Sequence, residues 1–536
     1  MNVHLVRTAI ALAALCATLP SAAHDADSTS GQLGKVHFKV SCSASAQQEF
    51  DLAMAYYHSF AWEQIKAPLD RALQADSACG MAHWLRALAS LDNPFVWPGN
   101  VSAKTLADGA ALVEQARKSG LPTQRERDYV DALAVFFQDT DKLNHRTRAK
   151  SLESGLQSVA TKYPEDTEAT ILYGLVLSAN FDPADKQYKN QLRAAKLLEP
   201  VFAKQPEHPG AAHYLIHSYD YPPLAAQGMP AAQRYSKIAP AASHAQHMPS
   251  HIFTRVGSWT DSVVANTASA KADTATGPNT LHAYDYMVYA HLQMGQDRAA
   301  GSVKNSASAI AKPPDNFAAA FAYAAIPARL ALERGDWAAA ANLSLNPATD
   351  AYPWAKYPQA EAINAYARGL GAAALRDGPA VESELARLGN LRDRATELKI
   401  GYWVEQINIQ IDVVRSFAAF EAENVQAGLS GLRQAADRED ASEKHAVTPG
   451  PLLPAREILA LALLQKGDAA DALREFEAVL RKEPGRLRAL AGVGVAAERV
   501  GDAAKAREYA DQVSRQTAKT DVGIPGLQLA RQSVTR

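Results

Sequence analysis

Apolar positions along most of the chain recur with the period of an α-helix. Alanine-rich segments of about 12–16 residues are separated by short breaks that contain Gly-Asp or Pro. No convincing run of alternating β-branched residues, the pattern of a half-buried strand, interrupts this series. The pattern therefore predicts an all-α protein.

The helices recur in pairs, most clearly near the C-terminus. Gly467-Asp468 recurs as Gly501-Asp502, 34 residues later, and Pro484 closes the second helix of the first pair. This helix–turn–helix period resembles the tetratricopeptide repeat (TPR). The resemblance implies a TPR-like α-solenoid of helix–turn–helix repeats, whose first helices line a concave groove.

The order of these units predicts the organisation of the chain. Residues 1–23 are expected to form a signal peptide and residues 24–39 a flexible N-terminal tail. Residues 40–345 are expected to form an N-terminal and central TPR-like array that contains a His-rich segment at 208–291. Residues 346–536 are expected to form a C-terminal TPR-like array.

The N-terminus and the cysteines predict an exported protein. The apolar run from Thr8 to Leu19 follows a single positive charge and precedes small residues that end at Ala23, as in a signal peptide. No later stretch reaches about 18 uninterrupted apolar residues, so we expect no transmembrane segment and a periplasmic or secreted location. Cleavage would leave Cys42 and Cys79, an even pair that predicts a disulfide, with two metal-binding thiols as the alternative.

The composition narrows the range of partners. Of 536 residues, 47% are hydrophobic and 21% are charged, and 55 Lys and Arg balance 57 Asp and Glu for a net charge of −2. A protein that binds nucleic acid normally shows a basic surplus or a basic stripe. We therefore expect no nucleic-acid partner.

Histidines are concentrated in one part of the chain. Eight of the 15 histidines lie in the 84 residues from 208 to 291, roughly three times the number that a uniform spread would give. His213, His217 and Asp220 have the spacing i, i+4, i+7, which places two imidazoles and a carboxylate on one face of a helix.

A second set of histidines follows one repeat later. His244, His247 and His251 have the spacing i, i+3, i+7 and again share a helical face. Pro249 lies inside this set and is expected to tilt or restart the helix, because proline lacks a backbone donor.

The two sets are in register with the repeat. His213 and His247 are 34 residues apart, as are His217 and His251, and His282 follows after one further repeat. Equivalent positions lie on neighbouring first helices, whose axes pack about 8–10 Å apart. Imidazoles that reach a metal ion from both sides can bridge this gap.

These imidazoles predict a transition-metal site that binds one ion or a pair of ions. The expected ligands are His213, His217, His247, His251 and His282, and the expected supplementary ligands or orienting residues are Asp220, His244, Asp285 and Arg255. A ligand set that is rich in nitrogen and poor in sulfur suits Cu, Zn or Fe.

Other interpretations of the histidines remain open. The same faces would suit a groove that holds a peptide, a protein partner or a small-molecule ligand, and histidines bonded to backbone carbonyls would need no ligand at all. The favoured hypothesis is an exported TPR solenoid that binds a transition metal, a partner or a ligand in a concave His-rich groove. The alternative is a metal-dependent enzyme, of oxidase or hydrolase type, that uses the same cluster.

Two short motifs support the architecture. His247-Met-Pro-Ser-His251 and Cys79-Gly-Met-Ala-His83 are similar to segments of a group of bacterial exported TPR proteins. The resemblance supports the repeat assignment and implies no catalytic residue.

Overall fold

The computed structural model describes residues 32–99, 101–273 and 278–521. The predicted signal peptide at 1–23 and the first part of the predicted tail, at 24–31, lie outside the described residues.

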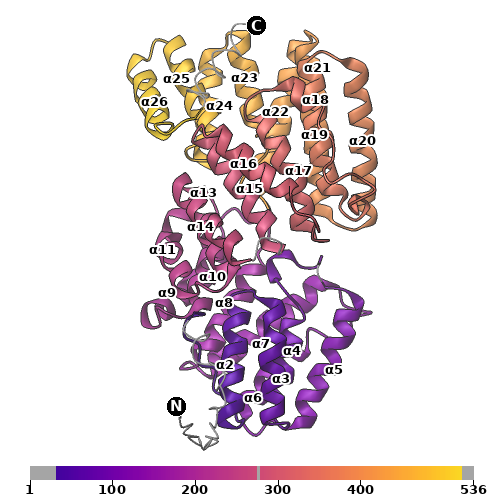
Figure 1. Ribbon diagram of the computed structural model, residues 1–536, viewed down its shortest axis with the longest axis vertical. Helices are drawn as coiled ribbons and strands as arrows, with labels where there is room; N and C mark the ends of the chain where they lie inside the picture. Colours follow the sequence, from indigo (N-terminus) through magenta and orange to yellow (C-terminus); the bar gives the residue numbers. More distant parts are fainter. Residues whose placement is uncertain (1–31, 100, 274–277, 522–536) are drawn as a thin grey trace, which may run out of the picture.

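Within the described ranges the regular structure is entirely helical, and no strand is present. Successive helices pack as pairs, and the pairs stack into an all-α, TPR-like solenoid, as the sequence predicts (Figure 1). The pairs are α2 (Ala44–His58) with α3 (Lys66–Ala75), α4 (Gly80–Ala89) with α5 (Ala103–Ser119), α6 (Gln124–Ala134) with α7 (His145–Lys162), α8 (Thr167–Ala179) with α9 (Lys189–Lys204), α10 (Pro209–Tyr219) with α11 (Met229–Ile238), α12 (Ser243–His247) and α13 (Pro249–Arg255) with α14 (Trp259–Ala272), α15 (Pro278–Gln293) with α16 (Asp297–Ser308), α17 (Phe317–Leu332) with α18 (Trp337–Ala341), α19 (Pro358–Ala374) with α20 (Gly378–Glu397), α21 (Gly401–Glu421) with α22 (Val425–Ala441), α23 (Ala455–Lys466) with α24 (Ala469–Lys482), and α25 (Leu487–Arg499) with α26 (Ala503–Gln516).

The turns within the C-terminal pairs lie where the 34-residue period places them. Gly467 ends α23 with φ 100° and Gly501 follows α25 with φ 85°, backbone conformations that favour glycine. Asp502 then starts α26 by accepting a hydrogen bond from the backbone N–H of Lys505 at 3.0 Å. In these two pairs glycine therefore follows the first helix, and the aspartate after it begins the second.

The segment before α2 is ordered rather than a flexible tail. Leu33 and Phe38 are fully buried, and the backbone N–H of Lys35 donates to the carbonyl of Glu207 at 2.9 Å. The prediction of a flexible tail was wrong for residues 32–39, because their apolar side chains find places in the core.

A disulfide joins Cys42 to Cys79, as predicted, with an S–S distance of 2.08 Å. The two cysteines lie next to the starts of α2 and α4. The bond therefore ties the first helices of the first two repeats together at the same end.

The buried side chains form two large cores that meet inside the His-rich segment. One core extends from Leu33 to Ala265 and the other from Leu281 to Val513. The array boundary predicted at residues 345 and 346 falls inside the second core, so packing divides the chain about 65–80 residues earlier than expected. Figure 1 shows α2–α14 in the lower part of the molecule and α15–α26 in the upper part.

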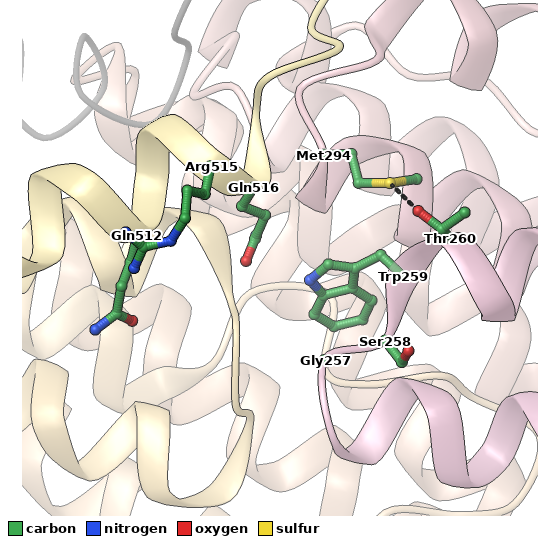
Figure 2. Close-up of a pocket in the computed structure, with 8 residues that line it drawn as sticks. All are labelled: Gly257, Ser258, Trp259, Thr260, Met294, Gln512, Arg515 and Gln516. Carbon is green, nitrogen blue, oxygen red and sulfur yellow. Dashed lines mark hydrogen bonds between the residues drawn. The ribbon is translucent and has the colours of Figure 1, made fainter.

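A surface pocket of about 470 Å³ lies at the seam between the two cores (Figure 2). The side-chain amide of Gln516 donates to the carbonyls of Gly485 and Gln293, each at 2.7 Å, and so connects α26 to the end of α15. The pocket is lined by Gly257, Ser258, Trp259, Thr260, Met294, Gln512, Arg515 and Gln516. Because its lining contains no histidine, this pocket is distinct from the predicted metal site.

One further finding concerns membranes. In the part of the chain that the structure describes, no helix combines the length and the apolar character needed to cross a bilayer.

Candidate metal centre

The structure gathers six histidines of the predicted segment into two groups of three. Within each group, one nitrogen atom per ring lies within 4.8 Å of the corresponding atoms of the other two rings. The first histidine group is His213 and His217 of α10 with His244 of α12, and the second histidine group is His247 of α12, His251 of α13 and His282 of α15.

The helix break at Pro249 places His244 and His247 on one helix and His251 on the next. Helix α12 ends at His247 and α13 begins at Pro249, as the sequence predicts. His244, expected only as a supplementary residue, is a full member of the first group. The predicted ligands His213 and His217 therefore join His244, rather than sharing one group with His247 and His251.

Four of the six histidines are buried, whereas His244 and His282 are partly exposed. His213, His247 and His251 are 0%, 1% and 2% exposed. Stacking of the helix pairs brings the rings together, and segments from distant repeats then cover them. Binding of a ligand or partner in a concave His-rich groove therefore stays a prediction.

Aromatic side chains from the first two repeats cover the first group. Phe95, in the short 3-10 helix η2 (Pro94–Val96), stacks on His217 with ring centroids 3.8 Å apart and planes at 13°. Phe60 has a left-handed backbone (φ 51°), and its ring centroid lies 4.4 Å from that of His213. A left-handed conformation is unfavourable for phenylalanine, so packing must hold Phe60 in this place.

The second group is covered by the segment between α22 and α23, residues 442–454. Lys444 extends its ammonium to within 3.4 Å of a carboxylate oxygen of Asp220. The hydroxyl of Tyr286 lies 3.4 Å from Nε2 of His251 and donates to the carbonyl of Thr448 at 3.3 Å. No local spacing could have revealed these partners, because Tyr286 and Thr448 are 162 positions apart and Asp220 and Lys444 are 224 positions apart.

Hydrogen bonds fix which nitrogen of His247 and His251 carries a proton. Nδ1 of His247 lies 2.6 Å from Oδ1 of Asn266, whose amide nitrogen donates to the carbonyl of Ser262 at 2.8 Å. Nδ1 of His251 lies 2.8 Å from the carboxylate of Asp220. Both acceptors are oxygen atoms without a hydrogen, so Nδ1 is the donor in each ring and Nε2 carries the lone pair of the neutral imidazole.

These two lone pairs face each other. Nε2 of His247 lies 3.0 Å from Nε2 of His251. Two unprotonated nitrogens cannot form a hydrogen bond, and adding a proton to either ring is opposed by its burial. The separation is close to that between two nitrogen ligands of one tetrahedral ion with bonds of about 2.0–2.1 Å. The arrangement therefore fits a shared cation better than a direct contact.

The first histidine group also contains imidazole nitrogens that the described residues leave without a hydrogen-bond donor. Nδ1 of His213 donates to the backbone carbonyl of His58 at 2.7 Å, which leaves Nε2 of His213 as an acceptor 3.1 Å from Nε2 of His244. Nε2 of His217 is buried and has no hydrogen-bond partner among the described residues. A buried nitrogen without a partner is costly unless something absent from the protein chain satisfies it.

Burial keeps these imidazoles neutral. It lowers the pKa of His247 to about 3, with His251 adding to the effect. Burial also lowers the pKa of His251, although Asp220 opposes this shift. The other four rings have pKa values well below the usual range because of burial and the neighbouring histidines; they are His213, His217, His244 and His282. Neutral imidazole is the form that binds metals.

Asp220 contacts His251, and Arg255 contacts Asp220. Arg255 donates from Nε to the Asp220 carboxylate at 2.8 Å and from Nη2 to the Asp220 carbonyl at 2.9 Å. Burial alone would raise the pKa of Asp220, but Lys444 and Arg255 hold it well below its usual range. Asp220 is therefore an anion that fixes the ring of His251.

Asp285 does not join the histidines. Its carboxylate receives Nε and Nη2 of Arg329 at 2.7 and 3.1 Å, and both side chains are fully buried. The prediction of a ligand role rested on the repeat spacing, and a bidentate partner 44 residues later in the chain takes this carboxylate instead.

A third set of candidate ligands, which the sequence did not reveal, behaves differently. Glu168 accepts Nε2–H of His58 at 2.9 Å and Nε2–H of His208 at 2.8 Å, and Tyr214 donates to Nδ1 of His58 at 2.9 Å. Burial alone would raise the pKa of Glu168, but the two imidazoles hold it well below its usual range. Every nitrogen of His58 is paired, so this network serves to hold His58, whose carbonyl orients His213.

Comparisons with known proteins add little to this geometry. No known protein family matches the chain, and no curated protein resembles it in sequence. Among solved structures, the human IFIT1 dimer with PPP-AAAA has a TM-score of 0.37 and 12% identity, over 92% of this chain and 100% of that chain. The human IFIT1 dimer with m7Gppp-AAAA has a TM-score of 0.36 and 11% identity, over 91% of this chain and 99% of that one.

A third solved structure, Naa15/Naa10 bound to HypK-THB, has a TM-score of 0.25 and 11% identity, over 91% of this chain and 74% of that chain. Likenesses this weak carry no inference about what this chain binds. The expectation that nucleic acid is not a partner rests on charge alone.

Proposed function

We propose that the protein binds transition-metal ions through its two histidine groups. The observation that carries this proposal is the 3.0 Å approach of the two Nε2 atoms of His247 and His251, with Nδ1 of each ring already used as a donor. The unpartnered Nε2 of His217 supports the same function for the first group. Six imidazoles without thiolates suit copper, zinc or iron rather than calcium or magnesium.

The number of ligands favours an ion that can react or bind a further ligand. Structural zinc sites usually have four protein ligands, whereas catalytic sites have three and keep one position open. Each group supplies three imidazoles. A metal-dependent enzyme is therefore the second candidate function, and the enclosed position of the histidines favours a small ligand over a peptide at the metal itself.

We further propose that the protein acts outside the cytoplasm, in a periplasm or as a secreted protein. The apolar N-terminal run with small residues up to Ala23 supports export. The disulfide between Cys42 and Cys79 supports an oxidising compartment.

Metal analysis of the purified full chain tests metal binding. We expect stoichiometric copper or zinc after loading and dialysis, and loss of about half of it in His247→Gln, because the second group loses a central ligand. His37→Gln is the matched control, since the side chain of His37 is 69% exposed and outside both groups. Metal content that is substoichiometric and unchanged in His247→Gln would overturn the proposal.

A further inference from the structure

The two histidine groups are close enough to act as one site. Between the groups, the ring centroids of His244 and His247 are 6.2 Å apart, and those of His217 and His251 are 6.3 Å apart. Within the second group, His251 and His282 are also separated by 6.3 Å. The six rings thus form one continuous set rather than two separate sites.

This spacing suits a pair of ions. Metal pairs that share a bridging ligand lie about 3.5–4 Å apart. With three imidazoles for each ion, each ion keeps a position open, and rings of the two groups that approach within 6.2–6.3 Å leave the ions close enough to share one small ligand. The rings at this boundary come from α10, α12 and α13, within one stretch of 35 residues from His217 to His251.

The charges around the site select among metals. None of the six ring ligands is a carboxylate, and the nearby Asp220 is already paired with Arg255 and Lys444. The side chains of Arg255 and Lys444 are themselves buried, at 2% and 6% exposure. Two divalent ions held only by neutral ligands beside two buried cations would be poorly compensated. Pairs of iron or manganese ions normally have carboxylate ligands, which this ring set lacks.

Copper satisfies both the preference for nitrogen ligands and the need for a low ionic charge. Among first-row divalent ions it binds nitrogen ligands most tightly, and as Cu(I) it carries a single charge, which halves the charge that the buried site must accommodate. Zinc shares the preference for imidazole but has no monovalent state in proteins. An imidazole-only pair therefore favours copper.

We propose that the two histidine groups form a single dinuclear copper centre that reduces dioxygen. This inference rests on the proposed metal-binding function. In the reduced state each Cu(I) gives one electron to O₂, which takes up two protons from solvent and leaves as hydrogen peroxide, while both ions become Cu(II). A water-derived hydroxide would then bridge the oxidised pair, and its negative charge would offset part of the charge of the two Cu(II) ions. Further turnover requires an external electron donor, for which ascorbate serves as the probe.

The enclosure of the site agrees with this small ligand. His213 and His251 are almost completely buried and Phe95 covers His217, while His244 and His282 are partly exposed. Dioxygen and hydroxide are small enough to reach ions held by rings that are mostly buried.

Electron paramagnetic resonance of the Cu(II)-loaded full chain tests the pairing. We expect two coppers per chain and a signal that accounts for less than about a tenth of them, because a bridging ligand couples the two unpaired electrons. His217→Gln and His282→Gln should each retain one copper, with a signal that accounts for all of it. His37→Gln should behave like the unaltered protein, and circular dichroism should confirm that each variant is folded.

Oxygen uptake provides the second measurement. After reduction by ascorbate and removal of the excess, the unaltered protein should consume one O₂ per two coppers, and His282→Gln should lose at least nine-tenths of this uptake. Two coppers with full signal intensity, or no oxygen uptake by the reduced pair, would overturn the dinuclear copper centre but leave metal binding intact. Stoichiometric zinc with no bound copper would likewise overturn the copper centre and leave metal binding intact. Absence of any stoichiometric metal would overturn both proposals.

Discussion

The carboxylate of Asp220 accepts a hydrogen bond from Nδ1 of His251 at 2.8 Å, across 31 positions of the sequence. The same carboxylate accepts Nε of Arg255 at 2.8 Å and lies 3.4 Å from the ammonium of Lys444. One anion therefore orients a candidate ligand and neutralises buried cations from two distant parts of the chain. This double role links the candidate centre to the stability of the fold.

Replacing Asp220 by asparagine should destabilise the metal-free protein. The side chains of Arg255 and Lys444 would stay buried without their anion, and breaking a buried ion pair typically costs about 3–5 kcal/mol. Urea unfolding at pH 7 measures the change. The control Asp261→Asn, at an exposed position, should alter the unfolding free energy by no more than about 0.5 kcal/mol. Equal stability of the two variants would show that Asp220 does not balance these cations.

Asn266→Ala should weaken metal binding at the second group alone. Asn266 accepts Nδ1–H of His247 at 2.6 Å, and loss of a residue that orients a metal-binding histidine typically lowers affinity by about 10–100-fold. Competition titration with a chelator measures the affinity of each group. Asn364→Ala, which removes a buried asparagine from the second core, is the matched control and should leave both affinities unchanged. An unchanged affinity in Asn266→Ala would contradict the orienting role.

The helices and their stacking were predictable because they depend on local signals. The 34-residue period places Gly467 and Gly501 at turns, and the same period brings His217 close to His251. The grouping of His244 with His213 was not predictable, because these residues are 31 positions apart and the 34-residue period instead matches His213 with His247. The pairing of Asp285 with Arg329 was hidden for another reason: the repeat spacing says nothing about a competing partner on the next repeat.

The enclosure of the site was not predictable either. Phe95 reaches His217 across more than 100 residues, and Lys444 reaches Asp220 across 224 residues. Contacts at such separations leave no periodic pattern in the sequence. The sequence therefore indicates which imidazoles converge, but not that other segments bury them.

Acid should lower the folding stability of the protein through His445, which lies in the segment that covers the second group. Burial, with Lys444 adding to the effect, lowers the pKa of His445 to about 4. Between pH 6.5 and 4 the unfolded chain binds a proton at this ring that the folded protein does not, so stability falls as the pH falls through this range. Urea midpoints at pH 7 and pH 5 should differ more for the unaltered protein than for His445→Gln. A difference of the same size in both proteins would exclude this histidine as a contributor.

Loss of the disulfide should lower stability without removing the metals. The bond between Cys42 and Cys79 closes a loop of 37 residues, and such a constraint typically contributes about 2–4 kcal/mol. Neither cysteine belongs to a histidine group, so the double variant Cys42→Ser/Cys79→Ser should unfold at lower urea concentration and keep its metal content. Loss of metal from a variant that remains folded would instead show that the thiols are ligands.

The central claim is that Nε2 of His247 and Nε2 of His251 bind the same ion. Anomalous diffraction from crystals of the copper-loaded protein, recorded at the copper edge, tests it most directly. The account predicts a peak about 2.0–2.1 Å from both nitrogens, with a second peak beside Nε2 of His217. Rings that turn apart, each bonded separately to water or backbone and with no peak between them, would contradict it.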